Sequence, residues 1–170
     1  MIIELASLGT NAKQIDIEFE PADIDLEGEL VQIAGKAKLT GKIALVDSKA
    51  HLSAAIKGRA SLACTRCLEP IERDVEFAFR DIFVDASAET TTEETELADE
   101  ALDESLVENG QIDMAEVVRE QLLLWLPEQI FCREDCRGLC PKCGGNLNLI
   151  DCKCDDEEVD PRWAALKSLK

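Results

Sequence analysis

The sequence predicts an α+β fold with an antiparallel, β-rich N-terminal half, one amphipathic helix and a Cys-rich C-terminal segment. Three observations support this order. Apolar residues alternate along several stretches of residues 1–84, which is the period of a half-buried strand. They recur at helical spacing over residues 113–127. Most of the eight Cys then follow in residues 128–170. A chain of 170 residues is long enough for a single domain with its own core.

The N-terminal half alternates most clearly in two stretches. The residues that share a face are Ile15, Ile17 and Phe19 in the first stretch, and Ile71, Val75, Phe77 and Phe79 in the second. Gly35 and Gly41 interrupt residues 31–46, and Gly58 interrupts residues 50–63, so we expect turns, bulges or breaks there. Sequential strands with short turns predict an antiparallel meander, or a partial barrel if the sheet curls.

Most of the net charge of −18 comes from one stretch of the chain. Residues 81–118 contain 13 of the 36 Asp and Glu and no Lys or Arg. The centre of this stretch has few large apolar side chains, so it cannot bury enough surface to offset its ordering entropy. We therefore predict an acidic flexible linker over residues 85–112. The alternative is an acidic docking arm for a basic partner.

A helix over residues 113–127 is predicted by signals at both ends. Asp113 is a good N-cap, and Glu116 follows three residues later, as in a capping box. Pro127 ends the helix. The residues on its apolar face are Met114, Val117, Val118, Gln121, Leu122 and Trp125. We expect this face to pack on the sheet.

Composition and motifs exclude several classes of protein. The sequence has no run of about 18 apolar residues and no secretory signal at its start, which predicts a cytoplasmic protein without membrane contact. It has no phosphate-binding loop, nucleophile elbow or metalloprotease helix, and His51 is its single His. We therefore expect no enzyme and no small-molecule substrate.

The cysteines are the strongest chemical signal, because eight Cys in a cytoplasmic chain favour metal ligation over disulfides. They are Cys64, Cys67, Cys132, Cys136, Cys140, Cys143, Cys152 and Cys154. Structural zinc is held by four thiolates at tetrahedral angles, and a Cys-x2-Cys turn brings two of them to one ion. The sequence thus predicts a zinc-stapled C-terminal segment with one or two structural ions. An iron–sulfur cluster is the alternative for four thiolates.

The eight Cys can be grouped in two ways. In the first, the last four form a local site, because the loop between them is short enough to close at a small entropic cost. The first four then clip a predicted hairpin of the β-rich half to the segment after the helix. In the second, the two Cys-x2-Cys turns share one ion, as in a zinc ribbon, and the other four form a second site or stay free.

Several strings of residues occur in an order that resembles the large ribosomal RNA subunit accumulation proteins, the YceD family. They are Cys64-Thr-Arg-Cys67-Leu-Glu-Pro70, Glu120-Gln-Leu-Leu-Leu-Trp-Leu-Pro127, the run from Cys132 to Asn148 with its GLCPKCGGNLN string, and Asp160-Pro-Arg162-Trp-Ala-Ala-Leu166. The resemblance implies a bacterial cytoplasmic protein needed for synthesis, processing or stability of 23S rRNA. In this family the gene often neighbours that of a small basic large-subunit ribosomal protein, which implies a partner.

These inferences combine into an expected function: a non-enzymatic factor in large ribosomal subunit biogenesis that binds a basic ribosomal protein, the 23S rRNA precursor or both. The acidic charge favours a basic protein, because phosphate contacts need clustered Lys and Arg. Direct RNA contact would need five basic residues to converge near the metal-held turns: Arg66, Arg73, Arg133, Arg137 and Lys142. The alternatives are an acidic chaperone or adaptor without a ribosomal role, and a thiol redox or metal-storage protein.

Overall fold

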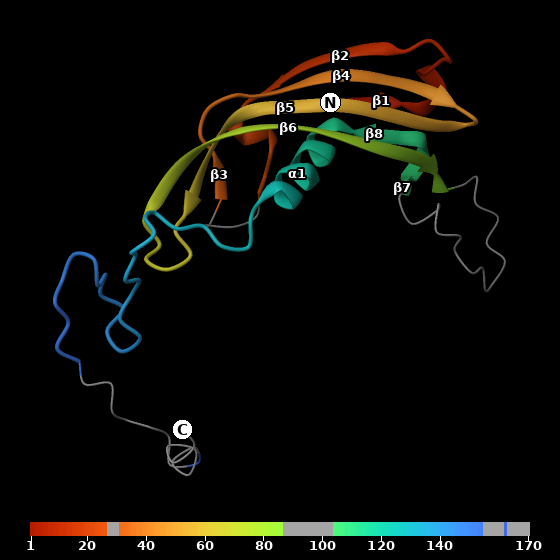
Figure 1. Ribbon diagram of the computed structural model, residues 1–170. Coiled ribbons are helices and arrows are strands. Elements are labelled where there is room, and N and C mark those ends of the chain that lie inside the picture. The colour runs from red at the N-terminus through yellow and green to blue at the C-terminus, as the bar shows by residue number, and fades with distance from the viewer. Residues whose placement is uncertain (27–30, 87–103, 155–161, 163–170) are drawn as a thin grey trace.

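The computed structural model describes residues 1–26, 31–86, 104–154 and 162 (Figure 1). A long curved sheet forms most of the molecule, and helix α1 (Met114–Trp125) lies under its concave side. The Cys-rich segment leaves the end of α1 and extends beyond one end of the sheet. The predicted α+β class, with a β-rich sheet, a helix and clustered Cys, is confirmed.

Within the described residues the strands form a six-stranded sheet and a two-stranded sheet. The large sheet contains β2 (Lys13–Phe19), β3 (Val31–Ile33), β4 (Ala37–Val46), β5 (Lys49–Ala63), β6 (Pro70–Asp85) and β7 (Glu104–Val107). Its order is β2-β4-β5-β6-β7, with β3 also beside β5. The small sheet pairs β1 (Ile2–Glu4) with β8 (Gln111–Asp113). Short 3-10 turns are η1 (Leu5–Ser7), η2 (Pro21–Asp23) and η5 (Glu108–Gly110).

The strands β4, β5 and β6 form the predicted antiparallel meander. The described sheet is open, since different strands stand at its two ends, so it is not a barrel. Gly35 interrupts the chain between β3 and β4 with φ +107°, a left-handed conformation that favours glycine. The interruptions expected at Gly41 and near Gly58 do not occur, because β4 and β5 are continuous there. Gly58 pairs with Val75 inside a continuous β5, and its missing side chain leaves room for Ala37 on β4.

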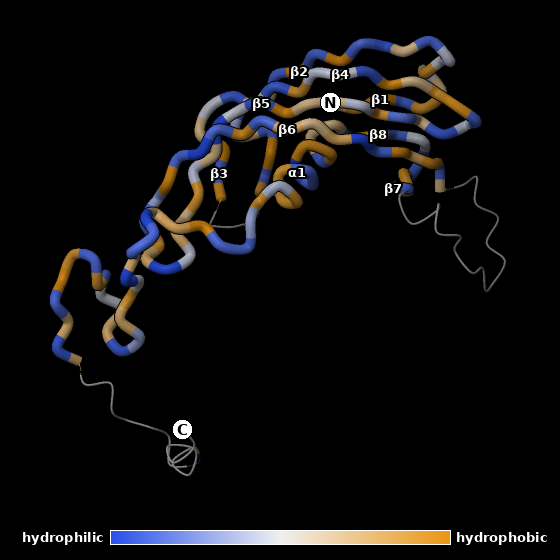
Figure 2. The backbone as a smooth tube through the Cα atoms, viewed as in Figure 1, coloured by the Kyte–Doolittle hydropathy of each residue, from blue (hydrophilic) through white to orange (hydrophobic). Residues whose placement is uncertain are grey.

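Helix α1 confirms the sequence prediction in position and in the face that it buries. The Asp113 carboxylate accepts a hydrogen bond from the Ala115 backbone N–H at 3.0 Å, which caps the first turn. The buried helix residues are Met114, Val117, Val118 and Leu122. The Trp125 ring stacks on Phe77 of β6, with ring centroids 6.2 Å apart. Hydrophobic and hydrophilic residues alternate along the strands above it (Figure 2). No helix in the described ranges is long and apolar enough to cross a membrane.

The predicted linker over residues 85–112 needs a correction at its C-terminal end. Residues 104–112 form β7, η5 and the start of β8, and β7 pairs with β6 in parallel, so the large sheet is mixed. Two long-range contacts hold this acidic segment: Glu104 forms an ion pair with Lys49, and Ser105 donates a hydrogen bond to Asp81 at 3.1 Å. The remaining linker residues 87–103 lie outside the described residues.

Candidate metal centres

The eight Cys lie in two groups of four. Cluster 1 contains Cys64, Cys67, Cys132 and Cys136, and cluster 2 contains Cys140, Cys143, Cys152 and Cys154. Within each cluster all four Sγ atoms lie within 4.8 Å of one another. This is the first of the two groupings that the spacing allows, and the ribbon-like pairing of the two Cys-x2-Cys turns is not adopted.

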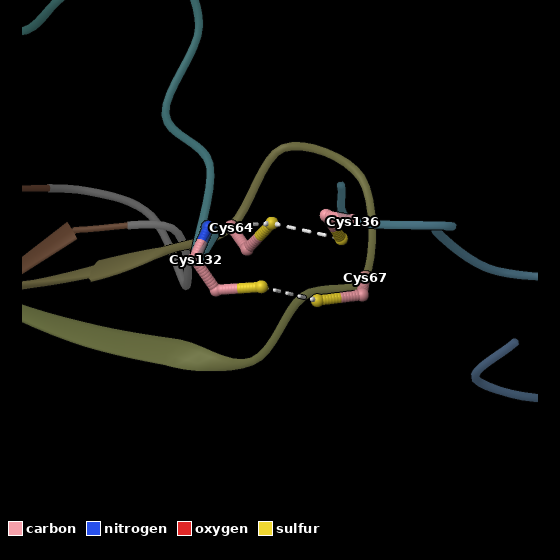
Figure 3. A group of neighbouring side chains, drawn as sticks. All are labelled: Cys64, Cys67, Cys132 and Cys136. Atoms are coloured by element: carbon pink, nitrogen blue, oxygen red, sulfur yellow. Dashed lines mark hydrogen bonds between the residues drawn. The ribbon is translucent and has the colours of Figure 1, made fainter. Parts of the chain in front are cut away.

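Cluster 1 joins two parts of the chain that are distant in sequence. The connection between β5 and β6 supplies Cys64 and Cys67, and the segment after α1 supplies Cys132 and Cys136 (Figure 3). Sγ of Cys64 lies 3.8 Å from Sγ of Cys136, and Sγ of Cys67 lies 3.6 Å from Sγ of Cys132. Three of these side chains are buried, and Cys132 is exposed. The cluster therefore clips the tip of the β5–β6 hairpin to the Cys-rich segment.

Backbone contacts hold the same two segments together beside the sulfurs. The Thr65 N–H donates to the Ile130 carbonyl at 2.8 Å, and the Leu139 N–H donates to the Arg66 carbonyl at 3.0 Å. The Arg66 guanidinium donates to the Cys136 carbonyl at 3.1 Å. The hairpin tip is thus docked on both sides of cluster 1.

Cluster 2 is built within one short segment. The Cys140 N–H donates to the Gly145 carbonyl at 2.8 Å, and the Gly144 N–H donates back to the Cys140 carbonyl at 2.9 Å, which closes a tight turn. Gly144 has φ +69°, the left-handed region. Sγ of Cys152 lies 3.4 Å from Sγ of Cys140 and 3.6 Å from Sγ of Cys143. Two of the four side chains, Cys143 and Cys154, are exposed.

These sulfur distances fit a single tetrahedral ion. With metal–sulfur bonds of about 2.3 Å, a regular tetrahedron places its sulfurs about 3.8 Å apart. A disulfide would require about 2.05 Å. The four separations given above, 3.4 to 3.8 Å, are therefore close to those of ligands around one ion, and the other pairs in each cluster lie within 4.8 Å. An iron–sulfur cluster places several irons and sulfides between its thiolates and needs a wider cage.

Electrostatics in cluster 1 favour some thiolates and oppose others. Burial alone would raise the pKa of Cys64, but N–H groups of Cys67, Arg66 and Cys132 donate to its sulfur and lower the pKa to about 6. Burial and the neighbouring sulfurs raise the pKa of Cys132 to about 12. A cation among the four sulfurs would relieve the repulsion that opposes the last deprotonations.

Cluster 2 follows the same pattern with less burial. Backbone N–H groups of Cys143 and Lys142 donate to Cys140 and lower its pKa to about 7. The Cys154 N–H favours the Cys152 thiolate, yet the surrounding sulfurs raise the pKa of Cys152 to about 12. In each cluster one thiol thus has a lowered pKa while a neighbouring thiol has its pKa raised to about 12.

The five basic residues named from the sequence are not equally available. The Arg66 guanidinium already donates a hydrogen bond to the Cys136 carbonyl, and its central carbon lies 4.0 Å from the centroid of the Phe131 ring. Arg133 pairs with Asp135, and Arg137 pairs with Asp151. Both acidic partners, Asp135 and Asp151, are themselves strongly exposed.

The other two, Arg73 and Lys142, lie on different elements. Arg73 is on β6, where it lines a cavity of 280 Å³ together with Trp125 and Phe131. Lys142 is exposed in the turn of cluster 2. The structure thus places four of the five basic residues in or beside the metal-binding turns and Arg73 on the adjoining strand.

Sequence reasoning quoted Asn146 and Asn148 in the GLCPKCGGNLN string but did not predict that they belong to the site. The Asn148 side-chain N–H donates to Sγ of Cys136 at 3.4 Å, and the Asn146 side-chain N–H donates to the Glu69 carboxylate at 3.1 Å. The signals that could have found them are their place in this string and their position shortly after a Cys-x2-Cys-Gly-Gly turn. Hydrogen bonds to the ligands of a metal commonly orient them.

The fold and the clusters together define a class: a β-rich protein with two four-Cys centres of the kind that holds structural zinc, one at a hairpin of the sheet and one in the segment beyond it. The chain belongs to the family described as large ribosomal RNA subunit accumulation protein YceD, whose model matches residues 52–170. The matched region contains both clusters, and it confirms the resemblance found in the sequence.

Two bacterial relatives match most of the chain, and a chloroplast relative matches a smaller part of it. An uncharacterised protein of Mycobacterium tuberculosis, Rv2926c, is 30% identical over 98% of this chain and 79% of its own length. An uncharacterised protein of Bacillus subtilis, YlbN, is 29% identical over 82% of this chain and 73% of its own. The chloroplast large ribosomal RNA subunit accumulation protein YCED homolog 1 of Arabidopsis thaliana is 35% identical over 35% of this chain and 19% of its own. No solved structure matches the chain.

Proposed function

We propose that this chain is a non-enzymatic, cytoplasmic factor in the synthesis, processing or stability of 23S rRNA and in large ribosomal subunit biogenesis. The observation that carries the proposal is membership of a family described by large ribosomal RNA subunit accumulation. In this proposal the protein acts by binding a basic ribosomal protein, the 23S rRNA precursor or both.

Each cluster holds one structural zinc ion in this proposal. Four sulfurs within 4.8 Å of one another supply a complete tetrahedral set, which leaves no open position for a reacting ligand. When bound, the ions supply rigidity and charge neutralisation. The residues Cys64, Cys67, Cys132 and Cys136 would hold one ion and Cys140, Cys143, Cys152 and Cys154 the other.

A basic protein is the partner that the charge distribution favours. An open cavity of 630 Å³ beside β7, β8 and α1 is lined by four carboxylate side chains: Glu108, Asp113, Glu116 and Glu120. Burial, followed by the nearby carboxylates of Glu116 and Asp81, raises the pKa of Glu120. A Lys or Arg of a partner placed there would offset this repulsion, and the attraction would weaken with salt.

Direct contact with the rRNA precursor is the second candidate. It is supported by Lys142 and Arg73, which lie near the metal-held end of the sheet. Phosphate contacts need such cations, and few of the basic residues near the clusters are free of acidic neighbours. We therefore expect any contact surface for RNA to be smaller than the contact surface for a basic protein.

The test combines depletion in the native bacterium with recovery of partners on the tagged full-length chain. We expect depletion to lower mature 23S rRNA and the large-subunit peak, and zinc analysis to find two ions per chain. Unchanged gradients would contradict the ribosomal role and favour an adaptor for another basic partner. Titratable thiols without bound metal would favour a redox protein.

Paired variants distinguish the two partners. The double change Glu116→Gln and Glu120→Gln should weaken capture of a basic ribosomal protein, whereas the matched double change Glu72→Gln and Glu76→Gln on the outer sheet face should not. Lys142→Ala should lower recovery of 23S rRNA precursor if RNA is contacted directly, with Lys57→Ala as its control. Equal effects of both glutamate pairs would contradict a role for the cavity.

A further inference from the structure

Asn148 belongs to the loop of cluster 2 in sequence, but its side chain contacts cluster 1. It lies between Cys143 and Cys152, and its amide N–H donates to Sγ of Cys136 at 3.4 Å. Its side-chain oxygen accepts the Arg137 backbone N–H at 2.8 Å, directly after that Cys. One side chain thus bridges the loop of one centre and a ligand of the other.

The position of Asn148 is fixed by its own loop. The Asn146 side-chain oxygen accepts from the Asn148 backbone N–H at 3.0 Å and from its side-chain N–H at 2.9 Å. The Asn146 amide in turn donates to Glu69 on the hairpin tip at 3.1 Å. The Leu147 N–H donates to the Gly138 carbonyl at 2.9 Å. The geometry of this loop depends on how its two ends are held.

Those two ends are held by the ligands of cluster 2. Cys140 and Cys143 stand before the loop, and Cys152 and Cys154 stand after it. An ion that gathers these four sulfurs closes the loop and reduces the number of conformations that it samples. Closing the loop therefore presents the Asn148 amide to Cys136 in an ordered position.

The geometry points to thermodynamic coupling between the two metal centres, with Asn148 as the positioning residue that connects them. The inference rests on the proposed binding of metal at both clusters. An ion at cluster 2 orders Asn148, whose hydrogen bond to Sγ of Cys136 then holds that ligand in place and so strengthens binding of the ion at cluster 1. Because coupling is reciprocal, an ion at cluster 1 strengthens binding at cluster 2 by the same factor.

The expected size of the effect follows from other second-layer contacts to metal ligands. Removing such a hydrogen bond typically lowers metal affinity by about 10- to 100-fold. The Gly138 backbone N–H also donates to Cys136, so the thiolate keeps one donor when Asn148 is lost. We therefore expect an effect near 10-fold on cluster 1.

The test measures metal affinity at each centre of the full-length chain. Cadmium NMR gives each centre its own resonance, and competition with a zinc chelator gives the affinities. Four chains are compared: wild type, Asn148→Ala, a chain without cluster 2 (Cys143→Ser with Cys154→Ser), and the combination of both changes. Asn11→Ala, an exposed Asn outside the Cys-rich segment, is the control.

If the centres are coupled, the effects of the two changes on the metal affinity of cluster 1 should not add in this double-mutant cycle. Asn148→Ala and the loss of cluster 2 each lower the affinity of cluster 1 by about 10-fold, and Asn148→Ala adds little once cluster 2 is gone. The cluster 1 cadmium resonance also shifts in the Asn148→Ala chain. Asn148→Asp keeps the acceptor for Arg137 but loses the donors to Cys136 and Asn146 and adds a negative charge beside the sulfurs, so it should weaken cluster 1 at least as much as Asn148→Ala.

Two results would overturn the coupling without touching the proposed function. One is a cluster 1 affinity that neither Asn148→Ala nor the loss of cluster 2 changes. The other is a fully additive cycle, in which Asn148→Ala has the same effect with and without cluster 2. A wild-type chain that binds no zinc or cadmium would instead contradict the metal-binding part of the proposed function itself.

Discussion

The two clusters use the same ligands in opposite settings. In cluster 1 the sulfurs in contact come from residues 65 and 72 positions apart, and three of the four Cys are buried. In cluster 2 all four Cys lie within residues 140–154, and two are exposed. Cluster 1 fastens the Cys-rich segment to the sheet, whereas cluster 2 shapes a loop within that segment.

Loop length alone does not separate the two clusters. By the chain-entropy model for cross-links, closing a loop of about 70 residues stabilises a fold by about 4 kcal/mol, and closing one of about 15 residues by about 3 kcal/mol. The difference is small because the entropy grows only with the logarithm of length. What distinguishes the clusters is therefore which structure each one holds, and substitutions in each should affect different parts of the molecule.

The largest effect is expected from Cys67→Ser in cluster 1. The change removes one ligand, so the ion is lost and the hairpin tip separates from the segment after α1. We expect one metal ion fewer per chain and a free energy of unfolding lower by about 4 kcal/mol. Elemental analysis and thermal unfolding measure both. Full metal content with an unchanged melting temperature would show that cluster 1 is not a metal centre.

A smaller effect on the sheet is expected from Cys140→Ser in cluster 2. The variant should lose the second ion and exchange backbone amide hydrogens faster over residues 137–154. The sheet should lose only the coupling to cluster 1, about 1.4 kcal/mol for a 10-fold effect. Hydrogen exchange followed by mass spectrometry separates the two regions. Faster exchange throughout β5 and β6 would contradict a local role for cluster 2.

The parts of the fold that sequence predicts are those whose signals are local. Helix α1 is fixed by its cap at Asp113 and by an apolar stripe within 12 residues. Cluster 2 is fixed by the short spacing of its Cys. The first grouping of all eight Cys followed from the same local argument, because assigning the last four left the first four as the second set.

The features that sequence did not predict depend on partners far along the chain. Strand β7 lies in a stretch whose composition indicates a linker, but Glu104 is neutralised by Lys49 and Ser105 bonds to Asp81. The sequence of β7 does not show that this strand pairs in parallel with β6, because the pairing depends on residues distant along the chain. The contact of Asn148 was not predicted for the same reason, because it is made with a Cys of the other cluster.

A chelator should remove zinc from the two clusters at different rates. Cluster 2 exposes two ligands to a chelator, Cys143 and Cys154, whereas cluster 1 exposes only Cys132 and buries its other three. We therefore expect zinc to leave in two phases, with cluster 2 first. A colour-forming chelator follows the release, and the Cys140→Ser chain should lack the fast phase. A fast phase that persists in that chain would assign rapid exchange to cluster 1.

The smallest difference is expected between two matched glycine substitutions. Gly138 and Gly144 have φ +75° and +69°, so alanine costs about 1–2 kcal/mol at either position through the left-handed backbone. A Cβ on Gly138 would lie 3.1 Å from the Arg66 carbonyl oxygen, whereas one on Gly144 meets nothing within 4 Å. The backbone strain is thus shared, and the crowding against the hairpin tip is confined to Gly138.

We therefore expect Gly138→Ala to lower the free energy of unfolding by about 1 kcal/mol more than Gly144→Ala, within the range found for overpacked sites. Only Gly138→Ala should also weaken the affinity of cluster 1 for zinc, because it pushes Leu139 away from Arg66. Denaturant unfolding and zinc competition on both chains give the comparison. Equal losses would mean that the backbone docking beside cluster 1 contributes little and that the sulfurs alone distinguish the two centres.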